Sequence, residues 1–288
     1  MVVRSLASLV KTVYPSVEQE RYLLPLIHTL VQRHRKNKTT IIGITGGQGT
    51  GKTTLSTFLQ ETLAQRGYKV GAFSLDDFYS SYAQRKRLAQ QFPHNPFYHI
   101  SRGLPGTHRV KALLKTLQAL KAGKRASIPV FDKSLHGGKG DIAGTLSVPA
   151  ALDFVIVEGW CLGIPPISVK KIFSICKKNK ISLKELGATV PDAQVVLNFI
   201  KWYQPVWKSI DYWIMLRPAT KGLHLKWRQQ QEAELRRKTG RGMDDTEVKQ
   251  FVKPYLSWTY VCYEEMRPQI TLWLNGQHRI YRATKRVK

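Results

Sequence analysis

Apolar residues recur along this chain with two spacings, and the two spacings alternate. Short apolar runs rich in β-branched residues are typical of buried strands, whereas apolar residues that return every three or four positions are typical of one helix face. Strands are predicted at residues 39–45, 68–75, 127–131, 152–157, 212–216, 269–274 and 279–282. Helices are predicted at residues 17–36, 53–65, 84–91, 110–122, 223–237 and 245–262.

This alternation predicts an α/β fold with three layers, αβα, in which a mainly parallel sheet carries helices on both faces. Residues 1–38 are expected to form a helical lead-in, and residues 39–288 a single domain. The segment 163–210 fits the alternation least well and is interpreted as an insertion. Residues 78–108 and 220–245, which include a Gly- and Pro-rich loop and a polar helix, are expected to be mobile.

The charge of the chain narrows the choice of partners. There are 46 Lys and Arg against 19 Asp and Glu, for a formal net charge of +27. Such a surface binds the phosphates of nucleic acid or attracts small anionic metabolites. The sequence has no RNA-recognition signature, no zinc-finger spacing and no clear DNA-reading helix. We therefore expect a small anionic molecule, rather than nucleic acid, as the main partner; the oligomeric state stays open.

Cysteine usage and apolar runs bear on the location of the protein. No apolar run reaches the roughly 18 residues of a membrane span, so no membrane partner is expected. Cys161, Cys176 and Cys262 are too few and too widely spaced for a disulfide framework or a zinc site. This pattern favours a reducing, cytoplasmic location. Residues 1–17 lack an acid, and an organelle transit segment there is the alternative to a short structural lead-in.

The most specific motif is a phosphate-binding loop (P-loop). Residues 46–53 read Gly-Gly-Gln-Gly-Thr-Gly-Lys-Thr and match G-x-x-x-x-G-K-[ST] between a predicted strand and a predicted helix. Glycines let backbone N–H groups surround phosphates, and the helix N-terminus adds positive potential. Lys52 is expected to reach the β- and γ-phosphates of ATP, and the Thr53 hydroxyl to ligate Mg²⁺. The expected nucleotide contacts are Gly46, Gly47, Gln48, Gly49, Thr50, Gly51, Lys52, Thr53 and Thr54. The motif and its setting predict a P-loop NTPase-type fold.

Acids follow two of the other predicted strands. Ligands of parallel sheets bind at the carboxyl ends of the strands, and Asp76 and Asp77 follow strand 68–75 there. A carboxylate in this place can accept the proton of an attacking hydroxyl. We assign that role to Asp76 and a metal or substrate contact to Asp77, although either could instead cap the following helix. Glu158 ends strand 152–157 in a Walker B arrangement and is expected to hold Mg²⁺ or its bound water.

These acids favour a kinase over other P-loop proteins. A GTPase would carry an Asn-Lys-x-Asp stretch, which the sequence lacks. A helicase or motor would require a longer chain with sensor elements. A protein that binds phosphates or nucleic acid without turnover is the alternative from a different class, but the combination of Lys52, Asp76 and Glu158 argues against it.

Taken together, the motifs resemble the D-glycerate 3-kinase family, part of the larger group that contains phosphoribulokinase, uridine kinase and pantothenate kinase. The resemblance covers residues 18–283. Besides the P-loop, its markers are Ser74–Tyr79, Gly103–His108, Val130–Ser134, Gly138–Asp141, Glu158–Trp160, Leu162–Gly163, Trp227–Arg228, Gln231–Glu232 and Gly242–Met243. One departure is Arg109, where the family pattern usually has an acid.

The resemblance implies transfer of the γ-phosphoryl group of ATP to the 3-hydroxyl of D-glycerate, which gives 3-phosphoglycerate. A nucleoside, pantothenate or a sugar phosphate is the alternative acceptor. The carboxylate of glycerate requires cations or N–H donors, and the candidates are His108, Lys133 and Arg102. Asp132 is expected to orient either Lys133 or the acceptor hydroxyl.

The same resemblance implies a lid at residues 220–245 that closes over the phosphates. Arg228 lies on its polar helix and is expected to stabilise charge on the transferred phosphoryl group. Arg236, Arg237 and Arg241 are further lid candidates that the sequence does not rank.

Overall fold

The computed structural model describes residues 13–99, 102–240 and 242–286, and everything below refers to these residues. Most of the possible transit segment, and Arg241, lie outside them. The helices are α1 (Ser16–Glu18), η2 (Gln19–Leu23), α2 (Leu24–Arg33), α3 (Lys52–Gln65), η3 (Leu75–Phe78), α4 (Tyr82–Gln91), α5 (Val110–Lys121), α6 (Leu135–Gly138), α7 (Val169–Lys178), α8 (Val190–Lys208), α9 (Leu223–Thr239) and α10 (Asp245–Glu265). The strands are β1 (Thr40–Gly46), β2 (Val70–Ser74), β3 (Ala126–Asp132), β4 (Asp141–Val148), β5 (Phe154–Trp160), β6 (Tyr212–Pro218), β7 (Ile270–Leu274) and β8 (Ile280–Lys285).

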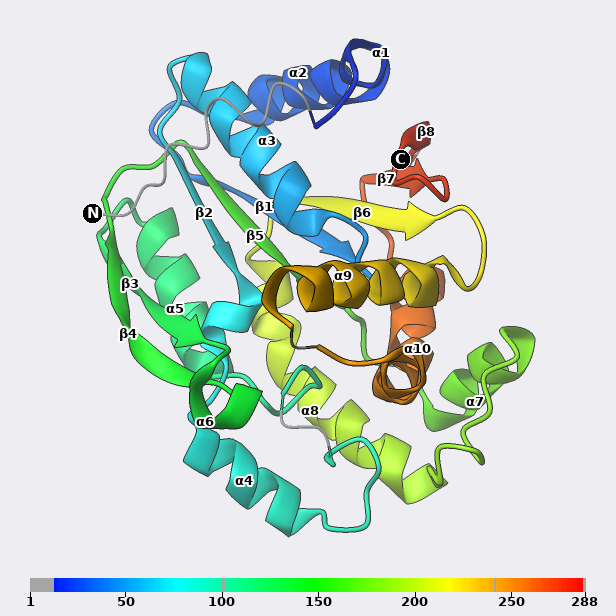
Figure 1. Ribbon diagram of the computed structural model, residues 1–288. Coiled ribbons are helices and arrows are strands. Elements are labelled where there is room, and N and C mark those ends of the chain that lie inside the picture. The colour runs from blue at the N-terminus through cyan, green and yellow to red at the C-terminus, as the bar shows by residue number, and fades with distance from the viewer. Residues whose placement is uncertain (1–12, 100–101, 241, 287–288) are drawn as a thin grey trace.

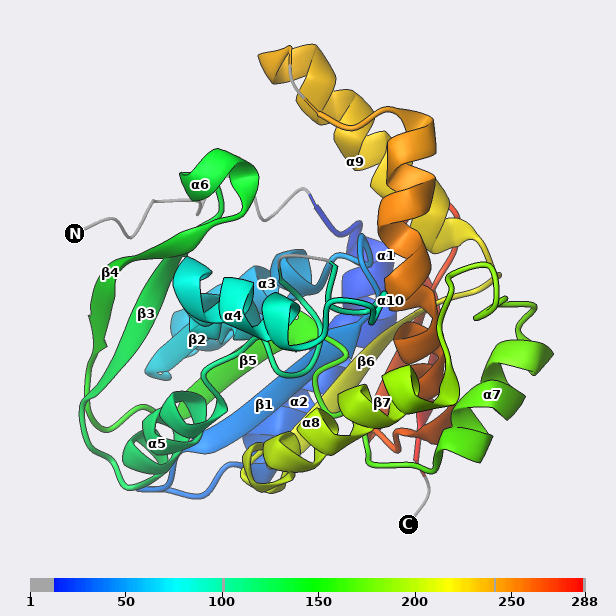
Figure 2. The same cartoon turned by 90° about the horizontal axis from the view of Figure 1, so that it is seen from below.

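The central sheet has the strand order β2-β5-β1-β6-β7-β8. The first five of these strands are parallel, and β8 pairs antiparallel with β7 at the edge. Helices cover both faces, with α2 behind the sheet and α5 and α8 in front of it in Figure 2. The predicted three-layer α/β fold with a mainly parallel sheet is confirmed.

Strand β1 contributes side chains to the hydrophobic cores on both faces of the sheet. Successive side chains of a strand point to opposite faces, and β1 is apolar on both. Ile42 and Ile44 pack into the core formed with α2 and α3, whereas Ile41 packs into the core formed with α5 and α8. All three side chains are fully buried. Burial on both faces is the reason why this strand reads as a continuous apolar run.

Two segments differ from the prediction for the sheet. Strand β3 lies outside the central sheet and pairs antiparallel with β4 in a separate two-stranded sheet (Figure 1). The sequence did not indicate β4, because most of its residues are exposed and it lacks an apolar run. The presumed insertion contains α8, whose Tyr203 and Val206 pack with Ile41 and Val157 in the core below the sheet. This helix is therefore an integral layer of the fold.

Helices α9 and α10 pack against each other beside the carboxyl ends of the central strands (Figures 1 and 2). Their position places the segment expected to form a lid directly over the P-loop, which follows β1. Within the described residues, no helix has the length and the apolar character needed to cross a lipid bilayer.

Candidate active site

The P-loop lies between the end of β1 and the start of α3. Gly49 and Gly51 have φ angles of 74° and 82°, a left-handed conformation that glycine adopts without strain. The Thr50 hydroxyl and the Lys52 ammonium both donate to the carbonyl oxygen of Gly47, at 2.9 and 3.0 Å. Lys52 therefore lies inside the loop, at the N-terminus of α3, where its ammonium can exchange the carbonyl of Gly47 for a phosphate oxygen.

Three side chains from the C-terminal third of the chain hold the P-loop from outside. The Tyr263 hydroxyl accepts a hydrogen bond from the N–H of Gly47 at 2.8 Å. His224 Nδ1 lies 3.4 Å from the carbonyl oxygen of Gln48, and His278 Nε2 lies 2.8 Å from that of Gly49. Burial lowers the pKa of His224 to about 4, so its ring is neutral at pH 7. No local motif indicated these contacts, because each joins residues far apart in sequence.

We predict that Tyr263→Phe loosens the P-loop. The change leaves the N–H of Gly47 buried without an acceptor, which costs about 1–3 kcal/mol and corresponds to a fall in Tm of about 2–10 °C. Calorimetry of the free protein and nucleotide titration measure the two expected losses, of stability and of ATP affinity. Tyr260→Phe, one turn earlier on α10, is the control. Equal effects of the two changes would contradict the specific role of Tyr263.

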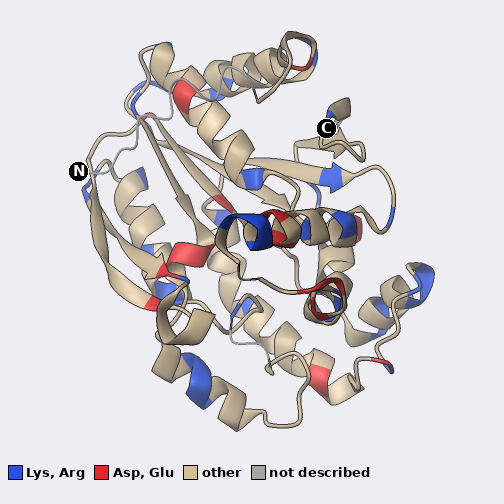
Figure 3. Cartoon of the chain, in the orientation of Figure 1, with Lys and Arg blue, Asp and Glu red and all other residues tan. Residues whose placement is uncertain are grey.

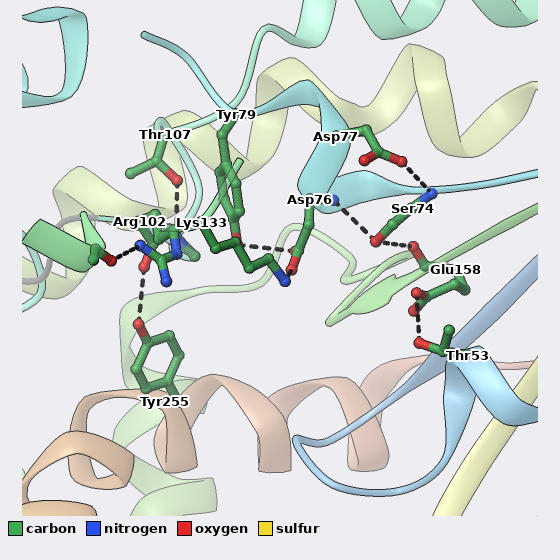
Figure 4. A network of polar contacts seen from close by, with 12 residues as sticks. Thr53, Ser74, Asp76, Asp77, Tyr79, Arg102, Thr107, Lys133, Glu158 and Tyr255 are labelled. Carbon is green, nitrogen blue, oxygen red and sulfur yellow. Dashed lines mark hydrogen bonds and ion pairs between the residues drawn. The ribbon is translucent and has the colours of Figure 1, made fainter. Parts of the chain in front are cut away.

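Oxygen atoms suited to Mg²⁺ meet beside the loop. The Thr53 hydroxyl donates to Glu158 Oε1 at 3.0 Å, and Glu158 is 8% exposed (Figure 4). Mg²⁺ in kinases takes one or two carboxylates together with phosphate and water oxygens, so this hard, oxygen-only pair fits the ion. Asp77 lines the same cleft, but one of its carboxylate oxygens accepts from the N–H of Ser74 at 2.9 Å. Burial raises the pKa of Asp77, and the neighbouring Asp76 carboxylate raises it further.

Asp76 lies on the other side of the cleft in a polar network. Its carboxylate accepts from the Tyr79 hydroxyl at 2.9 Å and from Lys133 Nζ at 2.7 Å (Figure 4). Burial acts to raise the pKa of Asp76, but the charge and hydrogen bond of Lys133, together with the hydrogen bond from Tyr79, lower it, and the pKa lies below its ordinary value. Asp76 is therefore ionised at neutral pH. Lys133 reaches it from the end of β3, in the two-stranded sheet beside the central one.

The cleft between these groups has a volume of about 880 Å³. Arg102 lines it and donates to the carbonyl oxygen of Gly138 at 2.6 Å. Arg228 lines it from α9, where the guanidinium forms an ion pair with Glu232 and lies over the Phe251 ring. The P-loop lysine, the strand-end acids and these two arginines thus surround one space. The cleft is also lined by Gln48, Gly49, Ser74, Tyr79, Gly103, Phe131, Gly137, Gly159, Trp160, Gln231, Met243 and Tyr255.

The structure does not bring every predicted residue to the cleft. His108 is 7% exposed and lies behind Tyr79, on which it stacks with ring centroids 4.5 Å apart. Its Nδ1 lies 2.8 Å from the Tyr203 hydroxyl, and burial lowers its pKa to about 4, so it offers no positive charge at pH 7. The carboxylate of Asp132 accepts from the N–H and hydroxyl of Ser134, at 2.8 and 2.6 Å, in the turn that carries Lys133. Both residues support neighbours that face the cleft.

The lid candidates differ in their surroundings. Arg236 donates to the carbonyl oxygen of Met243 and so joins α9 to the segment before α10. Arg237 is exposed. Of the described arginines in this segment, only Arg228 lines the cleft.

Fold and site together define a nucleotide-binding P-loop protein of the kinase class, because strand-end carboxylates face the loop across a cleft large enough for a second substrate. Residues 41–170 match the model of the "Phosphoribulokinase / Uridine kinase family". The chain is 36% identical over 234 residues to "Uncharacterized kinase mug58" of Schizosaccharomyces pombe, a match that covers 77% of this chain and 80% of that protein. The chain belongs to the phosphoribulokinase and uridine kinase family and is a small-molecule kinase.

Two further comparisons concern proteins named D-glycerate 3-kinase. The chloroplastic enzyme of Arabidopsis thaliana is 31% identical over 224 residues, which are 75% of this chain and 46% of that protein. The solved structure of D-glycerate 3-kinase from Cryptococcus neoformans superimposes with a TM-score of 0.80 at 25% identity, over 94% of this chain and 100% of that one. This similarity extends over nearly the whole fold.

Proposed function

We propose that this kinase transfers the γ-phosphoryl group of ATP to the 3-hydroxyl of D-glycerate and releases 3-phosphoglycerate. The observation that carries the proposal is the ion pair between Asp76 and Lys133, at 2.7 Å. It puts an ionised carboxylate and a cation side by side, across the cleft from the P-loop. A small hydroxy acid presents the complementary pair of groups, a hydroxyl and a carboxylate. The similarity to two proteins named D-glycerate 3-kinase supports the same acceptor.

The proton of the acceptor hydroxyl goes to Asp76. When the 3-hydroxyl lies against this carboxylate, Asp76 orients it toward the γ-phosphorus and accepts its proton as the new O–P bond forms. Tyr79 holds the carboxylate in place through its hydrogen bond to Oδ1. Lys133 and Arg102, both on the acceptor side of the cleft, are proposed to bind the glycerate carboxylate. Asp132 and His108 act indirectly, by holding the turn of Lys133 and the ring of Tyr79.

The phosphates of ATP lie in the P-loop in this proposal. Backbone N–H groups of the P-loop, other than that of Gly47, which Tyr263 accepts, and the Lys52 ammonium bind their oxygens. Thr53 and Glu158, with Asp77 beside them, would hold Mg²⁺, which neutralises charge on the β- and γ-phosphates when bound. Arg228 approaches the γ-phosphate from α9 as the lid closes and excludes water from the cleft. We further propose a cytoplasmic location, which the three free, buried thiols support.

The test is a phosphorylation assay with ATP and Mg²⁺ on D-glycerate, uridine, pantothenate and ribulose 5-phosphate. Selective turnover of D-glycerate, with the phosphate on the 3-hydroxyl of the product, is expected. Turnover of another acceptor alone would reject D-glycerate and retain a related kinase. Absence of turnover with all four would leave only the nucleotide site.

Lys133→Met is predicted to affect acceptor binding and the pH profile together. The loss of the cation should raise the KM for D-glycerate about 10–100-fold, as expected for a charged hydrogen bond worth about 1.5–3 kcal/mol. Because Lys133 lowers the pKa of Asp76 and burial raises it, the acid limb of the kcat profile should move to higher pH. Steady-state kinetics from pH 5 to 9 measure both. An unchanged KM with an unchanged acid limb would remove Lys133 from the acceptor site.

A further inference from the structure

A second large concavity lies at the opposite end of the sheet from the P-loop. It has a volume of about 1140 Å³ and is formed where the amino ends of β1, β2, β5 and β6 meet the ends of α2 and α5. Residues that precede three strands line it: Lys69 before β2, Asp153 before β5 and Asp211 before β6. None of its lining residues belongs to the cleft beside the P-loop.

Basic side chains outnumber acidic ones in the lining. Arg33, Arg35, Lys36, Lys38, Lys69 and Lys121 all contribute to it. Its acids, Asp153 and Asp211, each direct one carboxylate oxygen to a backbone N–H, of Lys69 and Ile41 respectively, at 2.8 Å. The cations exceed the acids by four, and the C-termini of α2 and α5 subtract about half a charge each. A local excess of about three positive charges is left.

Helix capping does not account for this excess. A Lys or Arg in the last turn of a helix stabilises the negative end of the helix dipole, which explains Arg33 in α2 and Lys121 in α5. Arg35, Lys36 and Lys38 follow α2 and lie outside any helix. Figure 3 shows basic residues on many elements. The six basic residues named above differ in that they line a single concavity.

The segment that carries these cations has a defined conformation. The N–H of Lys38 donates to the carbonyl oxygen of Arg35 at 3.0 Å and closes a turn, with Asn37 at a φ of 62°. Asn tolerates this left-handed conformation in turns. Thr39 then fastens the turn to the fold, because its buried hydroxyl lies 2.9 and 2.7 Å from the carbonyl oxygens of Leu120 and Leu152. The turn that carries Arg35, Lys36 and Lys38 is therefore held in a defined conformation.

We propose that this concavity, which we call the basic basin, binds a small anion carrying two to four negative charges on phosphate groups. The charge of such a ligand matches the local excess, and the volume accommodates a phosphorylated metabolite. A concave wall made by five separate segments favours a compact ligand over an extended nucleic-acid strand. The basic basin and the catalytic cleft lie at opposite ends of the sheet and share no lining residue, so a ligand in one site does not sterically block the other.

Inorganic tripolyphosphate is the probe for the test. Isothermal titration into protein whose P-loop is saturated with ADP is expected to show one additional site. The double variant Lys36→Glu/Lys38→Glu should weaken this binding at least tenfold. Lys170→Glu/Lys177→Glu, which makes the same change of net charge on exposed positions of α7, should weaken it less than threefold. The milder Lys36→Gln/Lys38→Gln replaces the first variant if its Tm falls.

Several results would overturn the proposal. Absence of a second site, or equal weakening by the two charge-reversed variants, would reduce the effect to general attraction by a basic protein. A short single-stranded oligonucleotide is titrated in parallel. If it bound at least tenfold more tightly than tripolyphosphate and depended on Lys36 and Lys38, the basic basin would be a nucleic-acid surface instead. The titrations do not require turnover, so they stand apart from the choice of D-glycerate as acceptor.

Discussion

Asp76→Asn is expected to lower kcat by about 10²–10⁴-fold, the range that a positioned general base contributes. An amide retains the shape of the side chain and can still accept from Tyr79, but it cannot accept the proton of the acceptor hydroxyl. The change also removes the negative partner of Lys133. Because the P-loop lies across the cleft from Asp76, the Kd for ATP should change less than threefold.

Steady-state kinetics on D-glycerate and an equilibrium titration with ATP measure these two quantities on the same variant. Asp245→Asn, which changes an exposed carboxylate at the start of α10, is the matched control and should retain full turnover. Full turnover by Asp76→Asn would remove the base from the mechanism. A large loss of ATP affinity would show instead that Asp76 acts on the nucleotide.

Arg228→Ala is expected to lower kcat by about 10³-fold, since an arginine that neutralises charge on a transferred phosphoryl group contributes about 10³–10⁵. In the structure the guanidinium is held by Glu232 and by the Phe251 ring at 5.3 Å, at the edge of the cleft. Closure must exchange at least part of this pairing for the γ-phosphate. In the proposed mechanism this interaction is made mainly in the transition state, so the Kd for ATP should rise less than fivefold.

Two further variants separate catalysis from folding. Arg228→Ala leaves the buried Glu232 without its cation, which lowers stability as well as activity, so Tm is measured alongside kcat. Arg228→Lys retains the charge without the planar fork and should fall between wild type and alanine. Arg237→Ala, on the exposed side of the same helix, should retain kcat within threefold. Equal losses in Arg228→Ala and Arg237→Ala would reject a specific role for Arg228.

The sequence alone predicted the elements that depend on neighbouring residues. The P-loop is a run of eight residues, and its strand and helix are indicated by apolar spacing on either side. Asp76 and Glu158 were placed at one edge of the sheet because parallel strands end together, and they do face the same cleft. Their chemical roles stay predictions. Strand 127–131 was predicted as an element, but the sequence did not indicate that β3 lies outside the central sheet, nor that it pairs with the exposed strand β4.

Contacts between distant residues were decided only by the tertiary structure. Apolar spacing determines which side chains face a core and where an element ends, so it predicted the sheet and the position of its P-loop. It does not determine which segments meet afterwards. Three features join segments separated by dozens of residues or more. They are the ion pair of Lys133 with Asp76, the hydrogen bond from Gly47 to Tyr263, and the basic basin. Each results from the packing of whole helices and strands, whose free energy is spread over many side chains and leaves no local signature.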